Sequence, residues 1–211
     1  MQLGVDEAGK GPVLGSMFAA AVRANPERLP DGVGDSKDIQ PARREELALA
    51  IHDVADAVAV AEIPVERIDD PETDMNALTV AAHVEALAGV ARDGDEAYVD
   101  AGDTNAVRFE QNVGDGVSAD VDLRAEHGAD ETYPIVGASS IVAKVTRDAH
   151  VARLSAEYGD VGSGYPSDPA TRDFLREFVA DNDCLPACAR SSWQTSQDVL
   201  AAANQASLSD F

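Results

Sequence analysis

The stretch GVDEAGKGP, residues 4–12, constrains the fold most strongly because two incompatible structures share its pattern. Its first seven residues fit G-x-x-x-x-G-K, but a phosphate-binding loop also needs Ser or Thr after the Lys and a helix whose N–H groups face the phosphates. Here Gly11 follows Lys10, an apolar strand-like run comes next, and Asp6 and Glu7 would face a triphosphate. We therefore interpret the stretch as a short strand whose end carries two carboxylates before a glycine turn.

The order of apolar and polar segments predicts an α/β domain with a mixed β-sheet flanked by helices. We expect strands at 2–6, 12–23, 57–65, 95–100 and near 117–126, and helices at 41–57, 74–91, 139–159, 169–180 and 194–203. The first two strands are expected to pair as a hairpin. A chain of 211 residues without a clear linker is most simply one domain. We expect residues 1–203 to form that domain, residues 204–211 to form a tail, and the protein to act as a monomer.

The charge of the chain is unusual, because 39 acidic and 16 basic residues give a net charge of −23. Disorder would explain such a charge, but an apolar content of 45% and the periodic segments argue against it. A folded surface this acidic repels itself in dilute salt, whereas at about 1 M salt the screening length falls to about 3 Å. We interpret the surface as adapted to a cytoplasm with molar salt. No apolar run approaches the ~20 residues that cross a bilayer, and no signal core opens the chain, so we expect a cytoplasmic protein without a membrane partner.

Lysine is scarce, and only Lys10, Lys37 and Lys144 are present beside thirteen arginines. Each lysine lies in a stretch that looks functional for other reasons: AGKG, GDSK and SSIVAK. A compact, mobile ammonium group is suited to such a task. The two cysteines, Cys184 and Cys188, are too few for a tetrahedral zinc site, and we expect them to be free thiols packed as small hydrophobes.

Acidic residues that follow apolar runs are candidates for a metal site together with Asp6 and Glu7. Mg²⁺ and Mn²⁺ take oxygen ligands, and a cluster of acids without a cation would repel itself. Asp100 in AYVDAGD and Asp130 in EHGAD are such candidates, but the residues alone do not select Asp130 over Asp103 or Glu126. Neighbouring residues of a strand point to opposite faces. We therefore expect the first strand to end at Asp6 and Glu7, so that the turn breaks this alternation.

Six motifs occur in order between residues 4 and 195 and cover nearly the whole chain. They are GVDEAGKGPVLG, GDSK, YVDAGD, AEHGADETYPIVGASSIVAKVTRD, GSGYPSDP and ARSSWQT. Together they closely resemble archaeal ribonuclease HII, and the acidic composition resembles haloarchaeal members of that family. The resemblance implies a ribonuclease H-like fold with a C-terminal helical region. It also implies an endoribonuclease that uses two Mg²⁺ or Mn²⁺ ions to cleave RNA–DNA hybrids and ribonucleotides embedded in duplex DNA, leaving 5′-phosphate and 3′-hydroxyl ends.

The resemblance also implies the residues of the site. The four acids of the family, which would bind metal and carry catalysis, fall on Asp6, Glu7, Asp100 and Asp130. The substrate-binding residues that it implies are Gly9, Lys10, Gly11, Lys37, Lys144 and Tyr165. The glycine turn and the tyrosine would recognise the ribose 2′-hydroxyl, which distinguishes RNA from DNA, and glycine permits a close approach of the backbone. The lysines would lie near phosphates, with Arg43 and Arg44 adding contacts.

The tail NQASLSDF carries Gln205, Leu208 and Phe211 in the pattern Q-x-x-L-x-x-F. This pattern resembles the box that docks replication proteins on the sliding clamp. One helical turn would place Leu208 and Phe211 on the same side as a hydrophobic plug. The pattern indicates a sliding clamp as a partner, and an ordinary frayed tail is the alternative. For the whole chain, the alternative function is a clamp-associated protein that binds hybrids without cutting them.

We predict that the folded protein loses stability when salt is removed, because repulsion among the surface carboxylates then acts over a longer range. Thermal unfolding measured from molar to dilute KCl should show a melting temperature that falls steadily with the salt concentration. A melting temperature that is equal in dilute buffer would contradict the interpretation of the acidic surface.

Overall fold

The chain folds around a five-stranded mixed β-sheet with the strand order β3-β2-β1-β4-β5. The structure is a computed structural model that describes residues 1–34 and 39–209, with side chains up to residue 205. The strands are β1 (Gln2–Ala8), β2 (Met17–Ala24), β3 (Ala57–Ile63), β4 (Glu96–Asp100) and β5 (Asp122–Glu126). β1 and β2 form the expected antiparallel hairpin, and β2 pairs antiparallel with β3. β4 lies parallel to both β1 and β5, so the predicted mixed sheet is confirmed.

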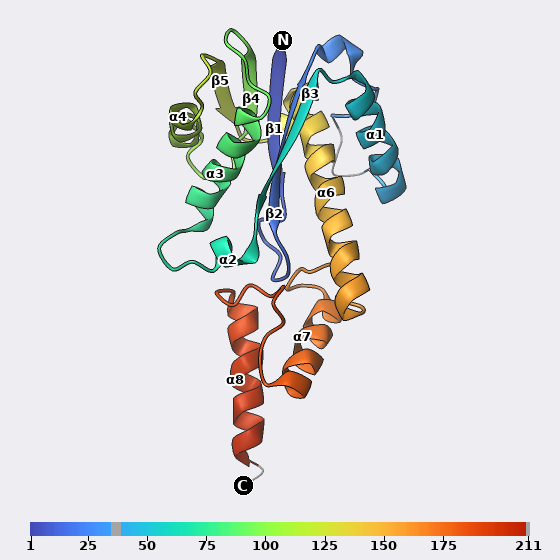
Figure 1. Cartoon of the computed structure of the whole chain (residues 1–211), viewed down its shortest axis with the longest axis vertical. Coiled ribbons are helices and arrows are strands. Elements are labelled where there is room, and N and C mark those ends of the chain that lie inside the picture. Colours follow the sequence, from blue (N-terminus) through green and yellow to red (C-terminus); the bar gives the residue numbers. More distant parts are fainter. Residues whose placement is uncertain (35–38, 210–211) are drawn as a thin grey trace.

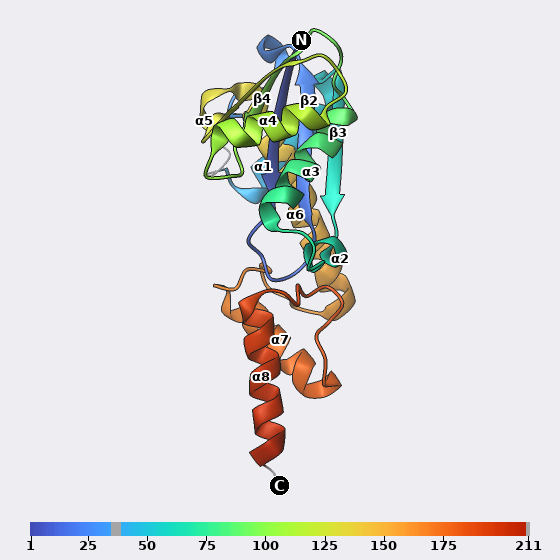
Figure 2. The ribbon, with the colours of Figure 1, turned by 90° about the vertical axis from the view of Figure 1, so that its left-hand side faces the viewer.

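Helices cover both faces of this sheet. They are α1 (Pro41–Val54), α2 (Val65–Ile68), α3 (Met75–Ala88), α4 (Ala106–Gly116), α5 (Ala129–Thr132), α6 (Pro134–Tyr158), α7 (Pro169–Asn182) and α8 (Gln194–Ser209), with a 3₁₀ turn at Pro26–Arg28. α3 and α4 pack together on one face, whereas α1 and α6 pack together on the other (Figure 1, Figure 2). In both views α7 and α8 lie beyond the end of the sheet, as the predicted C-terminal helical region.

Side-chain alternation along β1 divides the core between the two faces. Leu3 and Val5 are fully buried in the apolar cluster that contains α3. Gly4 points to the opposite face, where a Cβ atom would lie 2.1 Å from the carbonyl oxygen of Ile135 in α6. A glycine at this position lets α6 pack directly against the backbone of β1, because no side chain separates them. Residues of α6 can therefore reach the end of β1.

The loop between β1 and β2 is joined to the C-terminal region. Leu14 forms a β-bridge with Ala189, and the N–H of Val13 donates to the carbonyl of Gly164 at 2.8 Å. Val13 and Leu14 belong to a third apolar cluster, together with Leu175 of α7 and residues next to α8. The hairpin loop is thus held by backbone hydrogen bonds and by apolar burial, although its partners lie far away in the sequence.

Two strand predictions are wrong in detail. The second strand was expected at 12–23, but β2 starts at Met17, because Pro12 lacks an N–H and Gly15 adopts a left-handed φ of 78°. The third strand was expected at 57–65, but β3 ends at Ile63 before Pro64, and it pairs only with β2 at an edge of the sheet. Val60 of β3 is 42% exposed.

The helix predictions missed α4, whose sequence AVRFEQNVGDG contains two glycines and few apolar residues. Its signals are Asn105, which caps the helix by accepting from the N–H of Arg108 at 3.0 Å, and the buried pair Phe109 and Val113 at i, i+4. α6 begins five residues earlier than the predicted start at 139, with Pro134 in its first turn. α8 runs beyond the predicted end at 203, so part of the expected tail is helical.

Both cysteines are free, as expected, but Cys184 is exposed and only Cys188 is packed in the interior. Burial raises the pKa of Cys188 to about 11, so this thiol is a weak nucleophile at neutral pH.

Within residues 1–34 and 39–209, no helix has the length and apolar character needed to cross a membrane.

Candidate active site

The candidate site lies where the β1–β4 ladder ends. The last parallel pair joins Val5 to Val99, and the next residues on the two strands are Asp6 and Asp100. Beyond this point β1 pairs only with β2, and this pairing extends to Ala8. Asp6 and Asp100 therefore lie just past the last pair of this ladder, Asp100 at the end of β4 and Asp6 within β1, which runs on to Ala8. The carboxyl edge of parallel strands is the usual position of binding sites in α/β sheets.

Asp6 is buried and points toward α6. Its carboxylate accepts from the N–H of Glu7 at 2.7 Å and hydrogen-bonds with the hydroxyl of Ser140. Burial raises the pKa of Asp6 well above its usual value, and the charges of Glu7 and Asp100 raise it further. The Ser140 contact acts in the opposite direction. A charged Asp6 is therefore unfavourable in this site unless a cation is close to it.

Glu7 points to the other face of the sheet, toward α3. Its Oε2 atom lies 2.8 Å from Nε2 of His83, a fully buried side chain that packs edge-on against Phe109. Burial by itself raises the pKa of Glu7, but the hydrogen bond and charge of His83 and the charge of Lys10 lower it overall. His83 was not predicted from the sequence, and it fixes the orientation of the Glu7 carboxylate.

The expected position of Asp6 and Glu7 in a broken strand is therefore wrong. β1 includes both residues and keeps its alternation up to Ala8. Asp6 and Glu7 have partners on opposite faces, Ser140 and His83, but their charges interact, and the β1–β4 ladder ends beside them. The end of the β1–β4 ladder, rather than an early turn, makes a shared site geometrically accessible.

Asp130 is brought to this edge by a tight turn after β5. Gly128 adopts a left-handed φ of 69° immediately before α5, and the N–H of Ala129 donates to Oδ1 of Asp100 at 2.8 Å. Asp130 follows as a buried residue in the first turn of α5. Burial raises the pKa of Asp100, and the charges of Asp130 and Glu7 add to this effect. The four predicted acids thus interact electrostatically around one strand edge.

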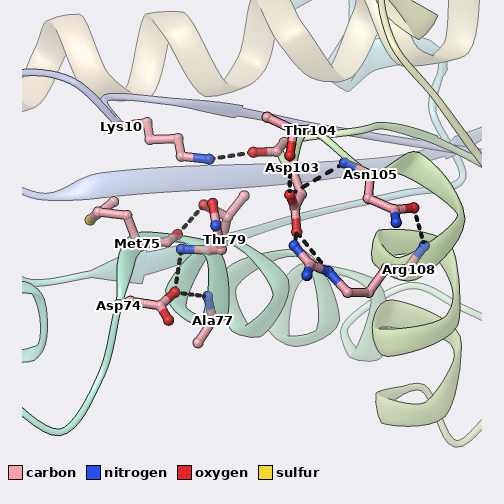
Figure 3. A network of polar contacts seen from close by, with 11 residues as sticks. Lys10, Asp74, Met75, Ala77, Thr79, Asp103, Thr104, Asn105 and Arg108 are labelled. Carbon is pink, nitrogen blue, oxygen red and sulfur yellow. Dashed lines mark hydrogen bonds and ion pairs between the residues drawn. The ribbon is translucent and has the colours of Figure 1, made fainter.

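The two acids that the sequence left as alternatives have other partners. Asp103 forms an ion pair with Arg108 at 2.5 Å and accepts from Asn105, as Figure 3 shows. The Arg108 hydrogen bond is the main cause that lowers the pKa of Asp103. The exposed Glu126 accepts from the hydroxyl of Tyr133 at 2.8 Å. The charge of Asp130, by contrast, is one of the causes that raise the pKa of Asp100, so Asp130 stays the predicted fourth acid.

Lys10 connects the glycine turn to the loop after β4. Its ammonium group donates to the carbonyl of Gly102 (Figure 3). Gly102 packs tightly against Glu7, because a Cβ atom there would lie 3.1 Å from Oε1 of Glu7 and 2.6 Å from a methyl group of Thr79. Lys10 thus lies near Glu7, and its charge lowers the pKa of Glu7.

A groove of about 370 Å³ opens beside the acids. Its lining residues come from the end of β1, the glycine turn, α1, α6 and the loop before α7: Glu7, Ala8, Gly9, Lys10, Gly11, Arg44, Lys144, Arg147, Asp148 and Tyr165. Four of them are basic and two are acidic, although the chain as a whole has a charge of −23. The groove is therefore a local basic surface on an acidic protein, as the binding of a polyanion requires.

The glycine turn forms one wall of the groove. Gly9 has a φ of 92°, and a Cβ atom at this position would lie 2.9 Å from the carbonyl oxygen of Ser16. Gly11 lies beside the Tyr165 ring, with 3.7 Å between its hypothetical Cβ atom and the ring. Tyr165 is 40% exposed, and the guanidinium of Arg147 lies 5.0 Å from its ring centroid. A residue other than Gly9 would strain the turn, and Arg147 holds the tyrosine in place.

Of the other basic residues predicted to lie near phosphates, two line the groove and one does not. Lys144 and Arg44 line the groove, and Arg44 forms an ion pair with Asp148 at 2.8 Å. Arg43 instead pairs with Glu46 on the exposed face of α1. Lys37 lies outside the described residues.

The set of donors suits a hard divalent cation. The four acids offer carboxylate oxygens, the ligands that Mg²⁺ and Mn²⁺ prefer. In the part of the chain that the structure describes, no three acidic, His or Cys side chains form a ready metal cluster. Mg²⁺ commonly keeps several waters and binds through one or two carboxylates and a substrate phosphate, so a closed cluster is not required. Burial is the main cause that raises the pKa values of Asp6 and Asp100, and the charges of neighbouring acids add to it. A bound cation would favour the charged form of both carboxylates.

The chain matches the family described as Ribonuclease HII over residues 3–196. It belongs to the ribonuclease HII family. The ribonuclease HII of Haloarcula marismortui is 68% identical over 211 residues, with both chains covered completely. The ribonuclease HII of Halobacterium salinarum is 58% identical, with 100% of this chain and 99% of the relative covered. These haloarchaeal relatives agree with the interpretation of the acidic surface.

Solved structures of ribonucleases H2 and HII share the fold. The ribonuclease H2 of Pyrococcus horikoshii has a TM-score of 0.91 and 37% identity, with 97% of this chain and 99% of that chain covered. The ribonuclease HII of Archaeoglobus fulgidus, solved in a complex with PCNA, has a TM-score of 0.84 and 37% identity, with 94% and 96% covered. The predicted family, the ribonuclease H-like fold and the enzyme class, a ribonuclease H of type 2, are confirmed. The assignments of individual site residues stay predictions.

We predict that Asp6→Asn raises the thermal stability of the metal-free enzyme near neutral pH. Because the folded state raises the pKa of Asp6 above 3.8, the unfolded chain ionises first as the pH increases, and the folded state loses stability. Asn removes this penalty, and each ~1 kcal/mol relieved should raise the melting temperature by roughly 2–4 °C in a chain of this size. Thermal melts in EDTA at molar salt, from about pH 4 to about pH 8, measure the difference, which should shrink toward the acidic end.

Added Mn²⁺ provides the control for this prediction. It should raise the melting temperature of the parent enzyme more than that of the Asn variant, because the variant has lost a ligand charge. A variant that is less stable than the parent at neutral pH in EDTA would show that the charged Asp6 carboxylate does not destabilise the folded state, which contradicts the prediction.

Proposed function

We propose that the enzyme hydrolyses the phosphodiester on the 5′ side of a ribonucleotide that is embedded in duplex DNA or paired with DNA. Asp6, Glu7, Asp100 and Asp130 would hold two divalent ions, Mg²⁺ or Mn²⁺. When bound, such ions activate a water and stabilise the leaving oxygen in phosphodiester cleavage. The products would be a 5′-phosphate and a 3′-hydroxyl.

The observation that carries this proposal is the position of the acids beside a basic groove. Glu7 both belongs to the carboxylate group and lines the groove with the glycine turn. A backbone phosphate bound in the groove would therefore lie next to the acids. The carboxylates alone would repel the phosphate, so its binding depends on cations and on the neighbouring basic side chains.

Different residues of the groove would contact different parts of the substrate. Lys10, Lys144 and, outside the described residues, Lys37 would contact phosphates. The backbone of Gly9, Lys10 and Gly11 would approach the ribose, and the Tyr165 ring would stack on the sugar with its hydroxyl near the same group. These contacts would select a ribonucleotide, because the 2′-hydroxyl is the group that DNA lacks.

Molar salt makes this local recognition more important. Binding that depends on counterion release weakens steeply as the salt concentration rises. An enzyme that works in such salt must rely on contacts at short range, namely hydrogen bonds to the ribose, stacking and bridging cations. The local basic groove on an acidic protein agrees with that requirement.

A cleavage assay tests the proposal directly. The enzyme is incubated at molar salt with a duplex that contains one ribonucleotide, with and without Mg²⁺ or Mn²⁺, and the cut is mapped. We expect a single metal-dependent cut on the 5′ side of the ribonucleotide and no cut in the all-DNA duplex. Asp6→Asn should reduce turnover by at least about 100-fold while the variant still binds the duplex. Binding without any cleavage by the parent enzyme would instead support the alternative, a protein that binds hybrids without cutting them.

We also propose that the C-terminal tail docks on a sliding clamp. Gln205 is exposed on the last turns of α8, which extends away from the rest of the protein (Figure 1). The side chain of Leu208 and the whole of Phe211 lie outside the described residues. The Archaeoglobus fulgidus relative, solved in a complex with PCNA, supports this kind of partner.

Deletion of residues 205–211 tests the docking proposal separately from catalysis. We expect the deletion to abolish binding to the sliding clamp, measured by surface plasmon resonance at molar salt, and to leave the cleavage of a free duplex within about twofold of the parent. Clamp binding that survives the deletion would remove the tail from this role.

A further inference from the structure

Arg190 is a fully buried arginine that connects the C-terminal region to the glycine turn. Its guanidinium donates three hydrogen bonds to backbone carbonyls of the β1–β2 loop: from Nη2 to Gly9 at 2.6 Å, from Nη1 to Lys10 at 2.9 Å and from Nε to Gly15 at 2.8 Å. These partners lie 175 to 181 residues away in the sequence. Among the described residues no carboxylate forms an ion pair with Arg190, so the carbonyl dipoles are the groups that directly solvate its charge.

The hydrogen bonds to Arg190 also determine where the N–H groups of the turn point. In a trans peptide the C=O and the following N–H point in opposite directions, and the chain has no cis peptide among its described residues. Because the carbonyls of Gly9 and Lys10 point toward Arg190, the N–H groups of Lys10 and Gly11 point away from it. Gly15 shows the same effect, since the N–H of Ser16 points away and donates to His150 at 3.3 Å.

Trp193 extends this arrangement to the next peptide. Its Nε1–H donates to the carbonyl of Gly11 at 3.3 Å, and its ring lies 4.8 Å from the Arg190 guanidinium. The following residue is Pro12, which has no N–H. Three consecutive carbonyls therefore face the C-terminal segment, and the only two N–H groups of these peptides face the opposite side.

Gly9, Lys10 and Gly11 line the groove together with Tyr165, whereas Arg190 and Trp193 are not among its lining residues. The N–H groups, which point away from Arg190, therefore lie on the side of the groove. Within the described residues, no hydrogen-bond acceptor is assigned to the N–H of Lys10 or Gly11. Two adjacent N–H groups directed into a groove can bind one oxygen of a ribose or a phosphate, as backbone nests do for anions.

We propose that Arg190 is the positioning residue that directs the N–H groups of Lys10 and Gly11 into the groove, and thereby sets the preference of the enzyme for a ribonucleotide. This inference rests on the proposed recognition of the ribose by the glycine turn. Arg190 itself does not contact substrate. It holds the carbonyls on the far side of the same peptide planes.

Lysine cannot replace arginine in this role. The guanidinium is planar and presents its donors in a fixed fork, which here spans three carbonyls, whereas an ammonium is a compact point charge. With Lys at this position at least one of the carbonyls loses its donor, and its peptide is free to rotate. Rotation of either peptide would turn an N–H out of the groove and place a carbonyl in it, which cannot donate to an oxygen of the substrate.

Binding of two duplexes tests the proposal without a dependence on turnover. Arg190→Lys is made in the Asp6→Asn chain, and dissociation constants are measured at molar salt by fluorescence anisotropy. The probes are a duplex with one ribonucleotide and the same duplex made only of DNA. We expect the parent to prefer the first duplex and Arg190→Lys to reduce this preference about 10-fold, chiefly by weakening the ribonucleotide complex.

Arg23→Lys is the matched control. Arg23 is also a buried arginine, and it pairs with Asp95 at 2.7 Å near the opposite end of β1 and β2. The control should lower the melting temperature and leave the preference for the ribonucleotide unchanged. If Arg190→Lys fails to fold, Trp193→Leu takes its place, since it removes the ring from the guanidinium and the donor from Gly11. We expect it to reduce the preference about threefold.

The outcomes separate this inference from the function on which it rests. A folded Arg190→Lys variant, or failing that Trp193→Leu, with an unchanged preference would overturn the role of Arg190, while the proposed function stands. A parent chain without any preference would overturn the recognition of ribose by the glycine turn, and the role of Arg190 with it. An equal loss of preference in Arg23→Lys would show a general effect of lower stability, which also overturns the inference.

Discussion

Burial and mutual repulsion of carboxylates beside the end of the β1–β4 ladder form the constraint on which the proposed metal site depends. The fold places Asp6 and Asp100 just past the last pair of the β1–β4 ladder, and a turn after β5 adds Asp130. Burial and mutual charge raise the pKa values of Asp6 and Asp100. A cluster of this kind is typical of a site that binds a cation, which is the reason for proposing that these acids hold divalent ions.

The short β1–β2 loop connects the acids to the groove in which we propose that the substrate binds. One end of the loop follows Glu7 directly, its middle forms the wall of the basic groove, and its far end is held by the C-terminal region. Lys10 also bridges to the loop after β4 through Gly102. The C-terminal region thus acts on the site through the backbone of the glycine turn, and its motif ARSSW is explained by the contacts of Arg190 and Trp193.

Much of the fold could be predicted from the sequence, because the strands and most helices carry their own periodicity. The geometry of the site was harder to predict from the sequence. Asp6 and Glu7 were expected to share a site through a broken strand, but β1 continues through both residues. The β1–β4 ladder ends beside them instead, which is a property of the register between distant strands. Asp130 could be chosen over Asp103 only through family resemblance, since the partner that neutralises Asp103 is provided by α4, a helix that the sequence did not reveal.

Arg190 and His83 were missed for a related reason. Each acts on a residue more than seventy positions away, and thirteen arginines in the chain gave no reason to single out one of them. The most direct test of the central claim, that four distant acids share divalent cations, is a crystal structure of the enzyme soaked with Mn²⁺ and measured for anomalous scattering. We predict manganese peaks coordinated by the carboxylates of Asp6, Glu7, Asp100 and Asp130. Peaks bound elsewhere, with these carboxylates empty, would contradict it.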